Sequence, residues 1–244
     1  MEQILIIQDV EQLVSLKGRI IVVETSRVND ITTIAKAAQK NNYLFCIKLH
    51  INQEITSIPF VQEWRKIPLV FYPSGLGEVR DLIRLLPILK KLNITFFLDC
   101  RKSKHYEDVQ TLSSLGIRSG IIIDKTADWE KLTDLMYFAL CGKIPHARIE
   151  PFQYLYDIYD RNTFMNYGAV FFEDPMVFRY FTTRDTKGAQ GAPRKSWNDF
   201  FYETRSCASC AGWRICLGKY AGLEDKTGCK DFTVKLLNLI EGLK

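Results

Sequence analysis

Short runs of β-branched and other apolar residues recur along the first 145 residues, at intervals of about 20 to 27 residues. Their hydrophobicity is continuous rather than alternating, which predicts strands covered on both faces, as in a parallel sheet. The predicted strands are residues 20–24, 43–49, 67–72, 94–100 and 119–124, with a further candidate at residues 4–8.

The segments between these runs have helical patterns. Residues 29–42 begin with a candidate cap at Asn29 or Asp30, and two further patterns end at Gly116 and Gly142. Residues 76–93 contain Pro87, which we expect to kink a helix. The apolar side chains of that helix at three-to-four spacing are Val79, Ile83, Leu86 and Leu89.

Strands that alternate with helices of this length imply βαβ units and a parallel sheet with right-handed crossovers. About six such units do not close an eight-stranded barrel. The predicted fold class is therefore α/β, a partial (β/α) TIM-like barrel, with a doubly wound sheet as the alternative. No glycine-rich fingerprint follows a strand, so a dinucleotide site has no support.

Ligands of parallel sheets bind at the carboxyl ends of the strands, and these ends form a polar row. The row is a candidate small-molecule pocket, or else it only marks where each strand meets solvent. Its residues are Glu24, Lys48, Tyr72, Asp99 and Asp124.

The strand–helix alternation is expected to end after Pro145, where aromatic residues become dense through residues 152–181. We expect two domains, a partial barrel at residues 1–145 and an aromatic-rich cysteine module at residues 146–244. The aromatic residues are interpreted as core, with a peptide-binding groove as the alternative. Residues 166–183 have the pattern of a hairpin. The loop that follows does not match a phosphate-binding loop, because Arg194 stands where such a loop needs a glycine.

Composition narrows the class of protein. The chain has 244 residues, 47% hydrophobic and 25% charged, which is ordinary for a globular protein with a sizeable core. Its net charge of +5 is small and spread out, so we do not expect nucleic-acid binding. No apolar run is long enough to span a bilayer and the N-terminus lacks a basic region, so we expect a cytoplasmic protein without membrane association.

Four of the seven cysteines lie close together in the tail. Cys207, Cys210, Cys216 and Cys229 are separated by two, five and twelve residues, and in a reducing compartment such a cluster indicates metal ligands. A Cys-x-x-Cys pair turns two thiolates toward one metal centre, and two further thiolates complete its ligand set. Zinc and a [4Fe–4S] cluster both accept four thiolates. The single Cys-x-x-Cys pair favours iron and sulfur, because zinc ribbons usually have two.

The remaining cysteines, Cys46, Cys100 and Cys141, share no ligand spacing and are interpreted as small buried apolar residues. The three histidines are scattered, and none stands near a serine or cysteine in a pattern typical of a hydrolytic triad.

The segment "WNDFFYETRSCASCAGWRICLGKYAG", followed by "GCKDF", resembles the end of a SPASM domain, the iron–sulfur module of radical SAM peptide-maturing enzymes. The resemblance covers residues 197–232 and implies that the four tail cysteines bind the second auxiliary cluster of that module. Tyr220 stands where the family has a cysteine of the first auxiliary cluster, and no cysteine lies between Cys141 and Cys207. The resemblance therefore implies one complete cluster and one absent cluster.

Residues 1–206 also lack the Cys-x3-Cys-x2-Cys motif that binds S-adenosylmethionine in this superfamily. The resemblance thus implies a degenerate member, of the pseudo-radical SAM or grasp-with-SPASM type, which is not a functional radical SAM enzyme.

The function expected is that of an iron–sulfur protein of ribosomal peptide maturation, which binds one [4Fe–4S] cluster and recognises a precursor peptide or delivers it to a partner enzyme. Four cysteine ligands leave no open iron, so the cluster would be structural or an electron relay. The sequence assigns no catalytic residue. One alternative is an enzyme that uses the strand-end carboxylates Asp99 and Asp124, with a structural metal in the tail. Another is a zinc-stabilised interaction domain.

Overall fold

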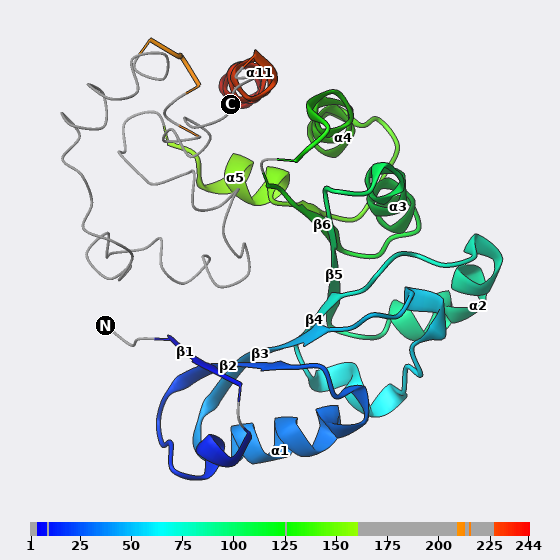
Figure 1. Cartoon of the computed structure of the whole chain (residues 1–244), viewed down its shortest axis with the longest axis vertical. Helices are drawn as coiled ribbons and strands as arrows, with labels where there is room; N and C mark the ends of the chain where they lie inside the picture. Colours follow the sequence, from blue (N-terminus) through cyan, green and yellow to red (C-terminus); the bar gives the residue numbers. More distant parts are fainter. Residues whose placement is uncertain (1–3, 9, 125, 161–208, 213–214, 216–226) are drawn as a thin grey trace. The chain divides into compact units, whose positions relative to one another are not determined.

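The computed structural model describes residues 4–8, 10–124, 126–160, 209–212, 215 and 227–244. These residues form an α/β fold around one seven-stranded parallel sheet (Figure 1). The strands are β1 (Ile4–Ile7), β2 (Ile20–Thr25), β3 (Tyr43–His50), β4 (Leu69–Tyr72), β5 (Ile94–Asp99), β6 (Ser119–Ile122) and β7 (Ile149–Glu150). All six strands predicted from the apolar runs are confirmed.

The strands follow one another across the sheet in chain order, from β1 to β7. A doubly wound sheet reverses its strand order at a switch point, so this order argues against that alternative. It is compatible with a partial (β/α) barrel. The ladder between β2 and β3 contains a register shift: Ile21 pairs with Leu44, but Val22 pairs with Cys46.

Helices follow most of the strands. The α-helices are α1 (Ile31–Asn41), α2 (Val79–Leu89), α3 (Ser103–Ser114), α4 (Trp129–Cys141), α5 (Phe152–Ile158) and α11 (Thr227–Leu243). Asp128 caps α4, because its side chain accepts a hydrogen bond from the Lys131 amide. Gly116 follows α3 with a φ of 84°, a left-handed conformation that favours glycine after a helix.

Two 3-10 helices, Ile55–Ser57 and Gln62–Lys66, take the place of an α-helix between β3 and β4. They contribute the buried side chains of Ile55 and Trp64 to the core. A ring cluster of Phe60, Trp64, Phe71 and Phe96, with neighbouring centroids 5.8–6.3 Å apart, fills this region.

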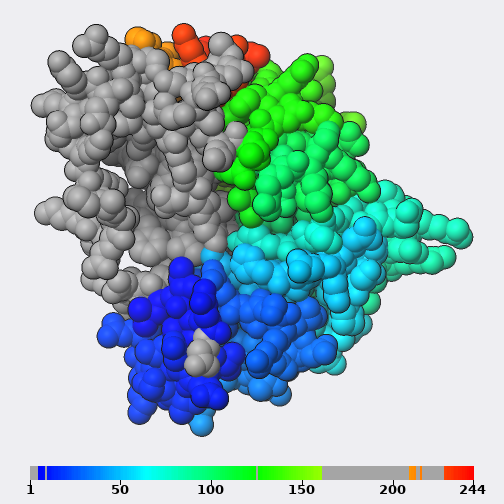
Figure 2. Space-filling view, viewed as in Figure 1, coloured from blue at the N-terminus to red at the C-terminus, as the bar shows by residue number. Residues whose placement is uncertain are grey.

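The chain groups into two compact units, and much of unit 1 packs around a single apolar core. Unit 1 comprises Met1–Asp99, Glu107–Ile121 and Ile144–Ile149; unit 2 comprises Cys100–Tyr106, Ile122–Lys143 and Glu150–Lys244. The core of unit 1 lies between one face of its strands and helices α1 and α2, which cover that same face (Figure 1). Its segments from β1 to α2 form a continuous surface in the space-filling view (Figure 2). The predicted division at residue 145 stays a prediction.

The structure shows which side of α2 is buried and corrects two details of the sequence interpretation. In α2 the buried residues are Leu82 and Leu89, whereas Val79 and Ile83 are exposed, because this helix has apolar residues on more than one side. The strand–helix alternation continues past Pro145 into β7 and α5. Cys141 is exposed at the end of α4, although Cys46 and Cys100 are buried as predicted.

Residues 166–183, the predicted hairpin, and the loop after them lie outside the described residues. Four residues of the aromatic stretch are described: Phe152 and Tyr159 are buried, in agreement with a role as core, whereas Tyr154 and Tyr156 are half-buried. Within the described part of the chain, no helix is both long and apolar enough to cross a bilayer.

The two neighbouring residues Leu82 and Ile83 provide a test of which face of α2 is buried. Leu82→Ala should lower the free energy of unfolding by about 2–5 kcal/mol, because it leaves a cavity in the core. Ile83→Ala, at a side chain that is 53% exposed, should change it by no more than about 0.5 kcal/mol. Urea denaturation measures both values, and equal losses would contradict this orientation of α2.

Candidate functional site

Two of the four predicted metal ligands fall within the described residues. Cys210 lies in the turn at residues 209–212, and Cys229 is the third residue of α11; both are half-buried. Cys207 and Cys216 lie outside the described residues. Among the residues that are described, no three His, Cys, Asp or Glu side chains gather in a group that could hold a metal ion. The quartet as a whole therefore stays a prediction.

The turn that carries Cys210 packs directly on α11. A Cβ added to Gly212 would come within 2.1 Å of Thr233 Oγ1 and 3.0 Å of the Thr233 carbonyl carbon, so the two backbones are in close approach. The Thr233 hydroxyl donates a hydrogen bond to the Cys229 carbonyl oxygen, at 2.8 Å, one helical turn earlier. Cys210 is two residues from Gly212, so both thiols belong to segments in mutual contact.

The first turn of α11 is held from α4 as well. A Cβ on Gly228 would lie 2.3 Å from Trp129 Cδ1, so only glycine fits beside that ring. The Trp129 ring also contacts Phe232, with centroids 5.7 Å apart, and Phe232 meets Phe152 of α5 edge to face at 6.5 Å. Burial of Phe232, Leu236 and Ile240 at four-residue spacing gives α11 one apolar stripe.

The other end of α11 is fixed by polar contacts to α5 and to the residue that follows it. The Tyr159 hydroxyl donates to Glu241 Oε1 at 2.7 Å, and the Tyr156 hydroxyl donates to the Leu243 carbonyl at 3.3 Å. The Lys244 ammonium donates to the Tyr159 carbonyl oxygen and lies 5.5 Å from the centroid of the Tyr156 ring. The helix that carries Cys229 is therefore docked along its length within unit 2.

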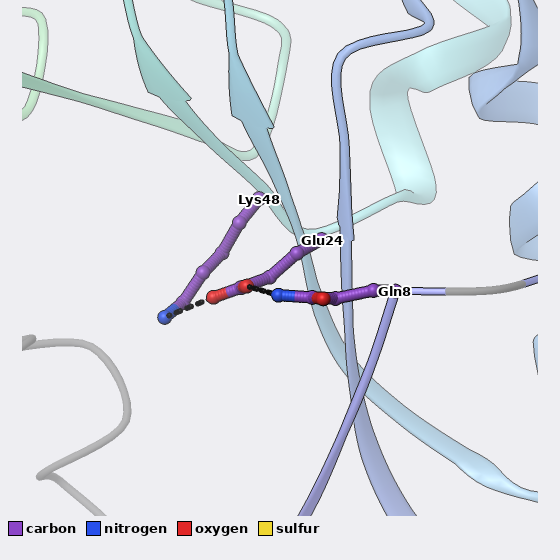
Figure 3. A network of polar contacts seen from close by, with 3 residues as sticks. All are labelled: Gln8, Glu24 and Lys48. Carbon is purple, nitrogen blue, oxygen red and sulfur yellow. Dashed lines mark hydrogen bonds and ion pairs between the residues drawn. The ribbon is translucent and has the colours of Figure 1, made fainter.

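A second set of polar residues lies on the face of the strands in unit 1 that is opposite the helices. Glu24 and Lys48 are direct partners in the β2–β3 register. Figure 3 shows their side chains reaching each other while Gln8 approaches the same carboxylate from the end of β1. The Lys48 ammonium lies 3.4 Å from Glu24 Oε1, and Gln8 Nε2 donates to Glu24 Oε2 at 3.1 Å.

Burial shifts the pKa values of two groups on this face, Lys48 and Cys46. The side chain of Lys48 is only 1% exposed, and desolvation lowers its pKa although the Glu24 carboxylate acts in the opposite direction. Burial also raises the pKa of Cys46, on the same strand, to about 12. Cys46 is thus a protonated thiol at neutral pH and a poor nucleophile.

Three rings form a row across β3, β4 and β5, on the side of the Glu24–Lys48 pair that is nearer the carboxyl ends of the strands. His50 stacks on Tyr72 with centroids 4.4 Å apart and planes within 8°, and Tyr72 stacks on Phe97 at 5.8 Å. Burial raises the pKa of Tyr72 and lowers the pKa of His50, so both rings are neutral at pH 7. The Gln8–Glu24–Lys48 set and these three rings lie side by side on this face, where Lys48 is buried and Gln8 and His50 are exposed.

Asp124, predicted for the strand-end row, belongs to a local loop network of unit 2. Its Oδ1 accepts hydrogen bonds from the Thr126 amide at 2.7 Å and from the Thr126 hydroxyl. The Cys100 thiol donates to the same oxygen at 3.3 Å, and the Asp124 amide donates to the Cys100 sulfur. Burial alone would raise the pKa of Asp124, but these hydrogen bonds outweigh it and lower the pKa, which makes Asp124 a poor general base.

Of the predicted row, the structure brings Glu24 and Lys48 together and places Tyr72 in the adjacent ring row. Asp99 ends β5 and is half-buried. Gln8 and His50 were missed in the sequence interpretation. The period of two along β3, which puts Cys46, Lys48 and His50 on one face, is the signal that identifies His50.

Comparison with known proteins gives no assignment: the chain matches no protein-family model, no curated protein and no solved structure. The class of protein defined by the described residues is thus an α/β protein with a parallel sheet in chain order and a docked C-terminal helix that carries Cys229.

Lys48 should give the fold a pH-dependent stability. Because folding lowers the pKa of Lys48 from its ordinary value of 10.5, the unfolded chain binds more protons at this group than the folded chain does. The free energy of unfolding of the wild type should therefore rise relative to Lys48→Met as the pH increases toward 10.5. Urea denaturation across that range measures it, with the exposed Lys40→Met as control. A difference that does not change with pH would contradict the burial of Lys48.

Proposed function

We propose that this chain is an iron–sulfur protein of ribosomal peptide maturation. In this proposal Cys207, Cys210, Cys216 and Cys229 bind one [4Fe–4S] cluster in a small C-terminal SPASM-like module. The parallel sheet is the partial barrel that precedes this module. The chain recognises a precursor peptide, or delivers it to a peptide-modifying partner enzyme, and does not cleave S-adenosylmethionine.

The observation that carries the proposal is the contact between the Cys210 turn and α11. Cysteines that share a metal centre must come from segments in contact, and the approach of Gly212 to Thr233 satisfies this for Cys210 and Cys229, which are nineteen residues apart in sequence. Both thiols are half-buried, which suits ligands of a centre partly shielded from solvent. The docking of α11 on α4 and α5 supplies a fixed support for Cys229.

The ligand set determines what such a centre could do. Four thiolates occupy one protein ligand position on each iron of a cubane cluster, so no iron is left to bind a substrate. The chain's own residues would then set the solvent exposure of the cluster and position the cysteines. A structural role or an electron relay follows from this coordination.

The peptide-binding role is supported by composition more than by contacts. Aromatic residues are dense between Phe152 and Phe181, and only the first part of this stretch is described. There Phe152 and Tyr159 are buried against α11, whereas Tyr154 and Tyr156 are half-buried. Phe152 and Tyr159 are therefore not available as contacts with a peptide.

The enzymatic alternative has less support, because the Asp124 carboxylate is engaged in its own loop with a lowered pKa. The zinc-stabilised interaction domain remains a second candidate, because four thiolates suit zinc equally well. Metal analysis separates the zinc centre from the cluster.

Anaerobically purified protein should contain about four iron and four sulfide ions per chain. Cys210→Ser should lose most of both, since it removes a ligand, together with the visible absorption of the cluster. Cys141→Ser is the matched control, because Cys141 is exposed at the end of α4 and outside the proposed quartet. One zinc ion and no iron would favour the zinc domain, and no metal at all would overturn both.

Peptide recognition is tested separately. The immobilised, cluster-loaded chain should retain a precursor peptide encoded beside its gene, and an unrelated peptide of equal charge should pass through. Retention of both peptides alike, or of neither, would contradict specific recognition.

A further inference from the structure

Two glycines in unit 2 stand where the segments of Cys210 and Cys229 meet other elements. Gly212 approaches Thr233, and Gly228 approaches Trp129. Neither glycine has a positive φ, so the reason for glycine at both positions is lack of space and not backbone conformation. We propose that Gly212 and Gly228, with Thr233 and Trp129, form a clamp that positions Cys210 and Cys229, so that metal binding and docking of α11 are one coupled equilibrium. This inference rests on the proposed metal site.

On the Gly212 side of the clamp, a small shift of Thr233 cannot make room for a side chain at position 212. An added Cβ would meet Thr233 at its Oγ1 at 2.1 Å, its Cβ at 2.7 Å and its carbonyl carbon at 3.0 Å. A threonine side chain is short, so it cannot swing away from a clash at its own Cβ. Thr233 is also 2% exposed and bonded to the Cys229 carbonyl. Any side chain at position 212 would therefore push the Cys210 turn away from α11.

The Gly228 side is equally close. The added Cβ would lie 2.3 Å from Trp129 Cδ1 and 2.8 Å from Cγ, the ring atoms nearest the tryptophan backbone. The Trp129 ring is in turn held against Phe232, which is 1% exposed. A side chain at position 228, directly before Cys229, would shift the first turn of α11 relative to α4.

Metal binding and docking of α11 are coupled because Cys229 is part of both the helix and the proposed metal site. A metal that binds only the docked arrangement stabilises docking by its binding free energy, and by linkage, variants that oppose docking must weaken metal binding. Residues that orient metal ligands from outside the ligand set typically change metal affinity by about 10–100-fold. We expect Gly212→Ala and Gly228→Ala to fall in that range.

The experiment titrates cobalt(II) anaerobically into the full reduced chain and follows the absorption of the thiolate-bound ion. Gly242→Ala is the matched control, since Gly242 is on the same helix with nothing within 4 Å of the added Cβ. Gly242→Ala should bind cobalt like the wild type, whereas Gly212→Ala and Gly228→Ala should bind it about 10–100-fold more weakly.

A second-site change separates positioning from general loss of fold. Thr233→Gly removes the two nearest atoms that an alanine at position 212 would meet. The double variant Gly212→Ala/Thr233→Gly should therefore recover affinity relative to Gly212→Ala alone. Hydrogen exchange on the unaltered chain adds an independent readout: metal should slow exchange along α11.

The outcomes distinguish this inference from the proposed function. If the wild type binds metal and both alanine variants bind it equally well, the clamp is wrong and the metal site stands. If α11 exchanges at the same rate with and without metal, the coupling is wrong. If the wild type binds neither cobalt, zinc nor iron, both proposals are overturned.

Discussion

Burial of both faces of the parallel strands is the constraint on which this structure depends. One face of β2 to β5 packs on α1, α2 and the short 3-10 helices, and its side chains are almost all apolar. On the opposite face Val22, Cys46, Val70 and Phe97 are also buried. A strand in this position can hold a charged group only where a partner lies on the next strand. Glu24 provides that partner for Lys48.

The same constraint explains why the sheet could be predicted from sequence. Strands buried on both faces have continuous apolar runs that stand out from the amphipathic helices between them. The pattern located the strands from β1 to β6 to within a few residues. β7 was missed because it has only two residues, too few for a period to show. In α2 several faces carry leucine or isoleucine, so spacing alone could not choose the buried one.

The candidate sites were less accessible to prediction. Strand ends identified Glu24, Lys48 and Tyr72, but the pairing of Glu24 with Lys48 depends on register, which the sequence does not display. For the cysteines, spacing predicts a shared centre and does not predict which elements support it. The seventeen-residue helix α11 and the fit of Gly212 and Gly228 against Thr233 and Trp129 arise from tertiary packing. They have no counterpart in local periodicity.

Unit 2 stabilises its last helix differently from the way unit 1 stabilises its strands. Instead of a backbone ladder, α11 depends on a stripe of apolar side chains, aromatic contacts with α4 and α5, and tyrosine hydrogen bonds near its C-terminal end. Side-chain contacts of this kind can be weakened one at a time.

The register shift between β2 and β3 has a consequence for the whole face that carries Lys48. Ile21 and Leu44 pair on the helix side, and beyond the shift Val23 and Ile47 pair on that side again, so β3 has one residue more than β2 over this interval. Phe45 is that extra residue. With Phe45 present but without the register shift, strict alternation from Leu44 onward would turn Lys48 and His50 toward the helices and Ile47 and Leu49 away from them. The bulge that absorbs this extra residue thus keeps the apolar side chains of β3 on one side of the sheet and its ionisable side chains on the other.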